Sequence, residues 1–178
     1  LEGLPQVEYL LGHLAPISAT TIAKAERLKM IGTCRGGLEH LDLAAIREKR
    51  HIPIINVIRN AEPVADFTIG LMYATVRNIA AAAIQVKQGK WPQNFANDSY
   101  KSSFSNMKVG LVGLGHIGKI VAKRLNALGM SVSAFDPFAK QADLTAEGCL
   151  VNLCSLEELF QNSDVVSLHL RVVPETEN

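Results

Sequence analysis

The stretch from residue 108 to residue 136 constrains this chain most, because it orders a strand, a glycine turn, a helix and a second strand. The first strand, residues 109–112, is apolar throughout, as expected of a parallel strand that is buried on both faces. A helix is expected from about residue 117 to residue 128, with Gly129 as its left-handed C-cap. Residues 130–135 form the second strand. This order predicts a parallel α/β domain.

The turn between strand and helix is Gly113-Leu114-Gly115-His116-Ile117-Gly118, a G-x-G-x-x-G pattern. Gly113 permits a tight turn, Gly115 lets the backbone approach a pyrophosphate, and Gly118 lets the helix pack close to the strand. The helix N-terminus offers unpaired N–H groups and a positive dipole end to the phosphates. Asp136 lies 18 residues beyond Gly118, where a carboxylate can bond the ribose hydroxyls. We therefore predict dinucleotide binding; the alternative is a doubly wound domain that binds nothing through this turn.

Length, charge and cysteine content exclude several classes of protein. The 178 residues suit one large domain or two small ones, and the 48% hydrophobic content suffices for a packed core. The net charge of +1 gives no electrostatic reason to expect nucleic acid or an anionic membrane as a partner. Cys34, Cys149 and Cys154 lack C-x-x-C spacing, so we expect small core residues in a reducing compartment, with no disulfide or metal site. Without a basic-then-apolar leader or a long apolar run, we expect a cytoplasmic protein.

Strands and helices also alternate in the first third of the chain. Strands are expected at residues 7–11, 28–34 and 51–57, with one helix capped by Ser18 and another running from Asp42 through Arg50. The second of these strands continues into Arg35-Gly36-Gly37, a loop with two adjacent glycines. This alternation predicts a parallel sheet with covering helices.

A long helix is expected over residues 63–87, with Pro63 in its first turn. Its apolar residues recur in steps of four and three, which is a heptad seam. The seam consists of Ala65, Ile69, Met72, Val76, Ile79, Ala83 and Val86. Two interpretations stay open: an ordinary core helix, or a helix that spans two domains or pairs with its copy in another subunit. Arg77 and Asn78 at mid-helix argue against a membrane span.

The remaining segments are shorter. Residues 91–106 are polar and predict a surface connection, whereas residues 138–147 are too loosely patterned to predict an element. Residues 148–151 are expected to form a short strand. Ser155 and Glu158 form a capping box that opens a helix, and the last strand is expected at residues 164–170.

Four stretches resemble the D-isomer-specific 2-hydroxyacid dehydrogenase family, which includes phosphoglycerate, glyoxylate and formate dehydrogenases. They are residues 28–42 (LKMIGTCRGGLEHLD), 60–78 (NAEPVADFTIGLMYATVRN), 109–137 (VGLVGLGHIGKIVAKRLNALGMSVSAFDP) and 156–176 (LEELFQNSDVVSLHLRVVPET). The resemblance implies an α/β fold with two doubly wound parallel-sheet domains, flavodoxin-like and Rossmann-like, both incomplete here. Residues 1–62 would be a partial substrate-binding domain and residues 63–178 a partial NAD-binding domain, and we expect both ends to be truncated. In the family the long helix lies at a dimer contact, which implies a homodimer through residues 64–87.

The resemblance also implies site residues for NAD and for a small acid. The nucleotide contacts would be Gly113, Gly115, His116, Ile117, Gly118, Asp136, His169 and Leu170, and the substrate contacts would be Arg35, Gly36, Gly37 and Asn60. Adjacent backbone N–H groups form an anion-binding concavity, to which Arg35 would add charge-assisted bonds unless it is only a solvated loop cation. The family's catalytic arginine, glutamate and histidine belong to motifs that would follow Asn178, so no residue here is predicted to be catalytic and none to bind metal.

Two departures from the family pattern stand at these sites. Arg171 replaces a proline that many members have two residues after the histidine matching His169. The loop over residues 57–60 is one residue shorter than usual and lacks the common proline-glycine.

The resemblance implies an NAD-dependent oxidoreductase that transfers hydride between NAD(H) and a D-2-hydroxy acid/2-keto acid pair. Asp136 favours NAD over NADP, because its carboxylate would repel a 2′-phosphate. One alternative is an NAD-sensing interaction protein of the same fold, like the carboxyl-terminal-binding corepressors. Another is a different Rossmann enzyme, such as an adenosylhomocysteine hydrolase relative, against which the Arg35-Gly36-Gly37 loop argues. Neither the acid nor the reaction direction follows from the sequence.

Overall fold

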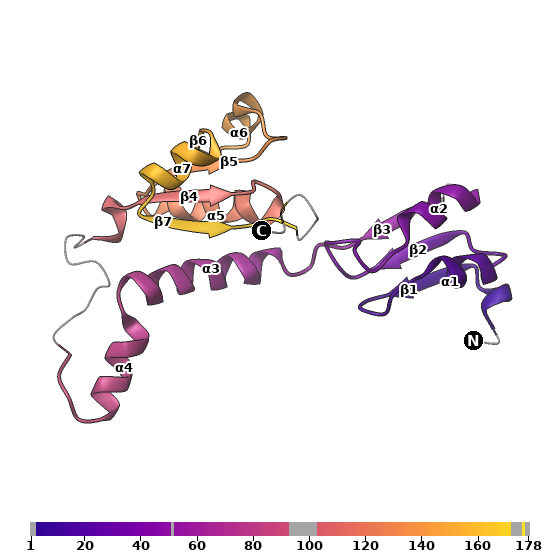
Figure 1. Cartoon of the computed structure of the whole chain (residues 1–178), viewed down its shortest axis with the longest axis horizontal. Coiled ribbons are helices and arrows are strands. Elements are labelled where there is room, and N and C mark those ends of the chain that lie inside the picture. The colour runs from indigo at the N-terminus through magenta and orange to yellow at the C-terminus, as the bar shows by residue number, and fades with distance from the viewer. Residues whose placement is uncertain (1–2, 51, 93–102, 172–175, 177–178) are drawn as a thin grey trace. The chain divides into compact units, whose positions relative to one another are not determined.

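The computed structural model describes residues 3–50, 52–92, 103–171 and 176. The chain divides into two compact units, Leu1–Asn60 and Ala61–Asn178, and each is described by itself. Both are built on parallel strands with helices between them (Figure 1), so the predicted parallel α/β architecture is confirmed.

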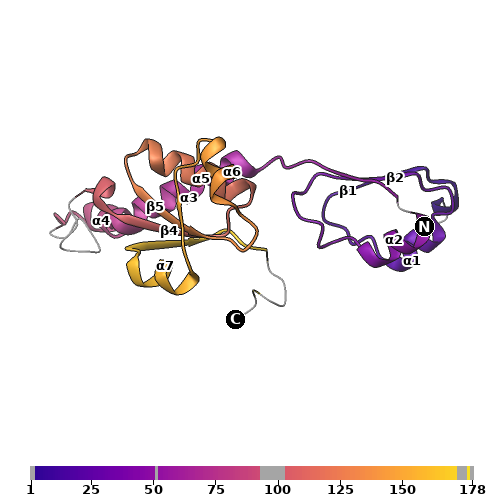
Figure 2. The same ribbon diagram turned by 90° about the horizontal axis from the view of Figure 1, so that it is seen from above.

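The first unit is a three-stranded parallel sheet in the order β1-β2-β3. After a 3-10 turn, η1 (Leu4–Gln6), its elements are β1 (Tyr9–Gly12), α1 (Ala19–Lys24), β2 (Met30–Thr33), α2 (Leu43–Arg50) and β3 (Ile54–Asn56). The central strand pairs Ile31 with Leu10 on one side and with Ile54 on the other. Helices α1 and α2 contact each other and lie on one face of the sheet (Figure 2).

Local hydrogen bonds explain why these helices begin and stay where they do. The Ser18 hydroxyl accepts the Thr21 N–H at 3.3 Å, and the Asp42 carboxylate accepts the Ala45 N–H at 3.0 Å. Both are N-caps that satisfy orphan donors of the first turn. The packed side of the unit buries isoleucines from each helix and from the central strand, whereas Leu11 on β1 remains exposed.

The second unit contains a four-stranded parallel sheet in the order β6-β5-β4-β7. Its strands are β4 (Lys108–Val112), β5 (Ser131–Phe135), β6 (Asn152–Leu153) and β7 (Val165–Leu168). Its helices are α3 (Ala61–Val76), α4 (Ile79–Lys87), α5 (His116–Ala127), α6 (Gln141–Ala146) and α7 (Leu156–Asn162), with a 3-10 turn, η2 (Phe104–Asn106), before β4. Helices α3 and α5 pack together on one face and α7 lies on the other (Figure 2).

Strand β4 is buried from both faces, as its apolar sequence predicts. Val109 and Leu111 are fully buried in the core that Val121 and Leu125 of α5 complete. Gly110 faces α7, where a Cβ atom would lie 2.5 Å from the Leu159 side chain. The strand therefore needs glycine at this position so that α7 can pack close to the sheet.

The predicted single helix over residues 63–87 is wrong, because α3 and α4 are separate and bent by 65° relative to each other. Asn78 between them has a left-handed backbone with φ 54°, which asparagine tolerates better than most residues. The heptad seam is therefore split. Met72 and Val76 are buried in the core of the second unit, whereas α4 buries no residue and exposes Ile79. Among the described residues no single helix is long and apolar enough to span a membrane, although the bent pair passes together by length and composition.

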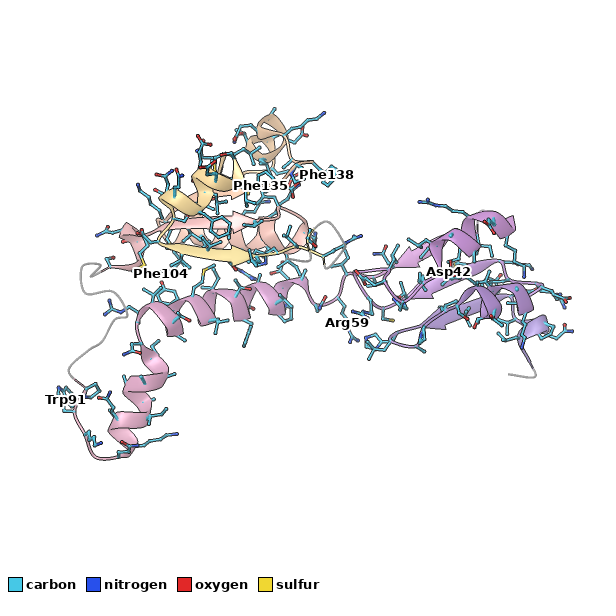
Figure 3. The ribbon with its side chains drawn as sticks, viewed as in Figure 1. Asp42, Arg59, Trp91, Phe104, Phe135 and Phe138 are labelled. Atoms are coloured by element: carbon cyan, nitrogen blue, oxygen red, sulfur yellow. The ribbon has the colours of Figure 1, made fainter. Side chains whose placement is uncertain are left out.

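Three smaller predictions also need correction. The strand expected at residues 148–151 instead begins at Asn152, because Gly148 takes a left-handed φ of 70° to end α6, a helix that was not predicted. Of the three cysteines expected in the core, Cys149 is buried, Cys154 is intermediate and Cys34 is exposed. Most of the polar connection expected at residues 91–106 lies outside the described residues; at its end, the Phe104 ring packs 4.0 Å from the Tyr73 ring of α3 (Figure 3).

The division of the seam between core and surface predicts unequal effects of one chemical change. We expect Val76→Ala to lower the free energy of unfolding of the second unit by about 1–3 kcal/mol, because it removes buried methyl groups and leaves a cavity. Val86→Ala is the matched control: Val86 is 56% exposed within its own unit, so this change should cost the monomer less than about 0.5 kcal/mol, and both variants are compared at a protein concentration at which the chain is monomeric. Denaturant unfolding followed by circular dichroism measures both, and equal effects would contradict the assignment of Val76 to the core.

Candidate functional site

The order of the second sheet creates a crevice at one defined place. The chain passes from β4 outward to β5 and β6 and then returns to place β7 on the other side of β4. In open parallel sheets, ligands bind at such a switch point, outside the carboxyl ends of the strands. The predicted glycine turn follows β4, and the predicted contacts His169 and Leu170 follow β7. These residues, far apart in the sequence, therefore meet at one edge.

Two glycines of the turn are required by close packing. Gly113 has φ 98°, and a Cβ atom there would lie 2.6 Å from the carbonyl oxygen of His169. At Gly118 a Cβ atom would collide with the carbonyl oxygen of Gly113. The sequence assigned these roles to the two positions, and the geometry agrees with them.

Gly115 differs from the other two because nothing lies beside it. A Cβ atom there would meet no atom within 4 Å, and Gly115 is the N-cap of α5 without a side-chain cap. In the described part of the chain, no acceptor bonds the backbone N–H groups of His116 and Ile117 in the first turn. An exposed glycine in front of unpaired N–H groups at a helix N-terminus is suited to an anion.

Asp136 stands beside this turn and is oriented by two backbone bonds. One carboxylate oxygen accepts the Leu114 N–H at 2.7 Å, and the other accepts the Phe138 N–H at 2.8 Å. The side chain is half-buried and forms part of the wall of a cavity of about 600 Å³. Since each carboxylate oxygen can accept more than one bond, lone pairs remain for hydroxyl donors in that cavity.

The cavity extends from the turn to α6 and contains residues that the sequence analysis missed. Phe138 is 91% exposed in the loop after β5 (Figure 3). Lys119 of α5 forms a 2.9 Å ion pair with Glu147, and its hydrogen bond lowers the pKa of that carboxyl group. Glu147 was missed because α6, which ends just before it, buries only Leu144 and so shows little helical periodicity.

His169 lies behind the glycine turn rather than in the open cavity. Its backbone N–H donates to the Val112 carbonyl at 2.8 Å, and its Nε2 atom lies 3.1 Å from the Ser167 hydroxyl. Burial lowers the pKa of the imidazole, which favours its neutral form. The side chain of Leu170 packs near Gly113. Both residues therefore support the turn by packing.

The second predicted group lies in the first unit, at the carboxyl end of β2. The Asn56 side-chain amide, on β3, donates to the Gly36 carbonyl at 3.2 Å and holds the loop of residues 34–37 beside the end of β3. Among the described residues, no acceptor bonds the N–H groups of Gly36 and Gly37, and no carboxylate pairs with Arg35. Asn60 is exposed at the end of this unit.

Among the described residues, no group of three or more His, Cys, Asp or Glu side chains lies close enough together to bind a metal ion. Arg171, at the position where many members of the resembled family have proline, is exposed, and its carbonyl accepts the Thr176 hydroxyl at 2.6 Å.

Comparison with known proteins gives one consistent result. Residues 69–178 match the family described as D-isomer specific 2-hydroxyacid dehydrogenase, NAD binding domain. A hydroxypyruvate reductase from Thermotoga maritima is 35% identical over 177 residues, which are 98% of this chain and 54% of that protein. A D-3-phosphoglycerate dehydrogenase from Methanocaldococcus jannaschii is 33% identical over 90% of this chain and 30% of its own length. The chain thus spans about half or less of these relatives.

The fold matches solved structures equally well. A D-lactate dehydrogenase from Aquifex aeolicus, complexed with NAD and lactic acid, aligns with a TM-score of 0.79 and 30% identity over 98% of this chain and 51% of its own. The match of the family over more than half of the chain includes the whole Gly113–Gly118 turn and Asp136. The chain therefore belongs to the D-isomer specific 2-hydroxyacid dehydrogenase family, and residues 69–178 match its NAD-binding domain.

Proposed function

We propose that the whole protein is an NAD-dependent oxidoreductase that transfers hydride between NAD(H) and a D-2-hydroxy acid/2-keto acid pair. The observation that carries the proposal is the turn itself: unpaired N–H groups behind an exposed Gly115, with Asp136 oriented at its side. Family membership supports the same activity. The relatives reported above are named as reductases or dehydrogenases, and nothing observed favours the corepressor-like alternative.

The residues at the turn fit NAD in their chemistry. The N–H groups of His116 and Ile117 would hold the pyrophosphate, and Asp136 would accept bonds from the ribose hydroxyls. The cavity walled by Phe138 and α6 has room for the adenine end. When bound, NAD supplies or accepts the hydride, and the protein orients it.

The loop in the first unit would bind the other reactant. The free N–H groups of Gly36 and Gly37 would offer an anion-binding concavity to the substrate carboxylate once the Glu39 carboxylate, which lies against Gly37, turns away, and Arg35 would add charge-assisted bonds. Asn60 is proposed as a further contact with the acid. The substrate is a small 2-keto or 2-hydroxy acid, in line with the hydroxypyruvate, phosphoglycerate and lactate in the relatives' names.

We also propose how the protein assembles and where in the cell it acts. We place the protein in the cytoplasm as a homodimer, with neither nucleic acid nor membrane as a partner. The exposed apolar side chains of α3 and α4 support the dimer, because a concentration of exposed apolar side chains marks interaction sites. They are Phe67, Leu71, Ile79, Ile84 and Val86, and each is at least 50% exposed.

The activity is tested by following NADH oxidation by the whole protein with a panel of 2-keto acids, including hydroxypyruvate, glyoxylate and pyruvate. Turnover of one or more of them supports the proposal. A folded protein that binds NADH but turns over none of them, nor the matching D-2-hydroxy acids with NAD, would refute it.

Cofactor choice gives the first specific prediction. We expect NAD to bind more tightly than NADP, because a 2′-phosphate would stand against the Asp136 carboxylate. Asp136→Ala removes that repulsion together with the ribose bonds, so NAD should weaken about tenfold while NADP weakens less or not at all. Calorimetric titration of both cofactors measures the ratio. An unchanged ratio in the variant would show that Asp136 does not discriminate between them.

The glycines of the turn give the second prediction, which separates binding from folding. Gly115→Ala should leave the melting temperature of the cofactor-free chain nearly unchanged, since its Cβ meets no atom, yet weaken NAD binding by blocking the approach to the helix N-terminus. Gly118→Ala is the contrasting variant and should lower the melting temperature as well, because its Cβ collides with the Gly113 carbonyl. Undiminished NAD affinity in Gly115→Ala would place the pyrophosphate elsewhere.

The dimer is tested on α4, which buries no residue within its own unit. Ile84→Glu should shift sedimentation equilibrium from dimer toward monomer without changing the circular dichroism spectrum, because a charge replaces an apolar contact. Gln161→Glu, on the exposed surface of α7, is the control and should leave the dimer intact. A dimer that survives Ile84→Glu would contradict an interface through α4.

A further inference from the structure

One buried histidine in the first unit has an unpartnered nitrogen and lies next to the loop proposed to bind the substrate carboxylate. His40 is 9% exposed, and its Nδ1 atom has no hydrogen-bond partner in the described part of the chain. Its Nε2 atom lies 3.0 Å from the hydroxyl of Thr33, which is 3% exposed at the end of β2. The Thr33 hydroxyl also accepts the Arg35 N–H at 3.3 Å. A buried imidazole is thus linked through one hydroxyl to the loop backbone.

The link between the two side chains holds in either tautomer of His40. With the proton on Nε2, the imidazole donates to the Thr33 oxygen; with the proton on Nδ1, the Thr33 hydroxyl donates to Nε2. In both cases the Thr33 oxygen keeps a lone pair for the Arg35 N–H.

The backbones of His40 and Thr33 are each held by hydrogen bonds that do not involve the imidazole. The carbonyl of His40 accepts the Ile17 N–H at 2.8 Å, and the Thr33 carbonyl accepts the Val57 N–H at 3.0 Å. The bond between the two side chains is therefore not needed to place either residue. The effect of this side-chain bond is to fix the Thr33 hydroxyl, which bonds the loop at the Arg35 N–H.

The loop needs such an anchor because Gly36 and Gly37 have no Cβ and can take many backbone conformations. Their N–H groups can bind an anion together only while both peptide planes keep one orientation. Two side-chain bonds orient this loop in the described chain: the Thr33 hydroxyl accepts the Arg35 N–H before the glycines, and the Asn56 amide donates to the Gly36 carbonyl. Before them, the Cys34 N–H donates to the Gly12 carbonyl at 3.3 Å. Without the Thr33 bond, the Asn56 amide alone would restrict residues 35–37 among the bonds described.

We propose that His40 and Thr33 are positioning residues: the bond to His40 Nε2 fixes the Thr33 hydroxyl, which in turn orients the Arg35–Gly37 amides for the substrate carboxylate. The proposal rests on the proposed function of that loop. Neither side chain contacts the substrate, and both act through the Arg35 N–H.

The test uses the 178-residue chain, with oxamate as a carboxylate probe. Thr33→Val keeps the shape of the side chain and removes the hydroxyl, and Thr33→Ser is the conservative variant that keeps it. We expect Thr33→Val to lower the NMR order parameters of the Gly36 and Gly37 amides and to weaken oxamate binding roughly three- to tenfold, the worth of one hydrogen bond. The oxamate affinity of Thr33→Ser should stay within about twofold of the wild-type affinity. The NADH dissociation constant, a property of the second unit, should not change.

The outcomes distinguish the positioning from the function on which it rests. Unchanged order parameters and oxamate affinity in a folded Thr33→Val chain overturn the proposal. If oxamate leaves the Gly36 and Gly37 amides of the wild type unshifted while Thr33→Val still loosens them, the carboxylate site fails and the positioning stands. Should Thr33→Val not fold, the wild type itself decides: three-bond couplings to the Thr33 methyl group must show a single side-chain rotamer, and averaging over rotamers overturns the proposal.

Discussion

The close contact between the glycine turn and the end of β7 is the constraint on which the second unit depends. Gly113 leaves no room for a Cβ atom beside the His169 carbonyl, and Gly118 leaves none beside the Gly113 carbonyl. These contacts hold the first turn of α5 against the ends of two neighbouring strands. As a result, a helix N-terminus with unpaired N–H groups opens at the switch point of the sheet, where parallel folds bind their ligands.

The same backbone also orients Asp136, the acid proposed to bind the ribose. Asp136 accepts N–H groups from Leu114, within the turn, and from Phe138, just after the strand. Its carboxylate is therefore placed by the turn that would hold the pyrophosphate. The loop in the first unit shows the reverse arrangement, since the Thr33 hydroxyl and the Asn56 amide orient a backbone that offers free N–H groups. In the second unit the main chain positions an acidic side chain, whereas in the first unit side chains position the main chain.

Much of this could be predicted because it depends on local sequence. The turn, the caps at Ser18 and Ser155 and the C-cap at Gly129 are local patterns with one structural solution each, and the structure contains them all. The continuous helix was wrong because its heptad pattern continues through Asn78, although the backbone turns left-handed there. Helix α6 escaped prediction because it buries only Leu144. The hydrogen bond between His40 and Thr33 could not be predicted, because the two side chains meet only when the loop between them is folded.

The central claim is that NAD binds at the Gly113–Gly118 turn with Asp136 beside it. Amide chemical-shift mapping of the isotope-labelled chain during a titration with NAD tests this most directly, because it reports on the backbone N–H groups of the turn and of the rest of the chain at once. The largest chemical-shift changes should fall on the amides of Gly115, His116 and Ile117 and on those of the loop after Asp136. Shifts that centre instead on the polar hollow around Ser131, Asn152 and Asn162, with the turn unaffected, would contradict it.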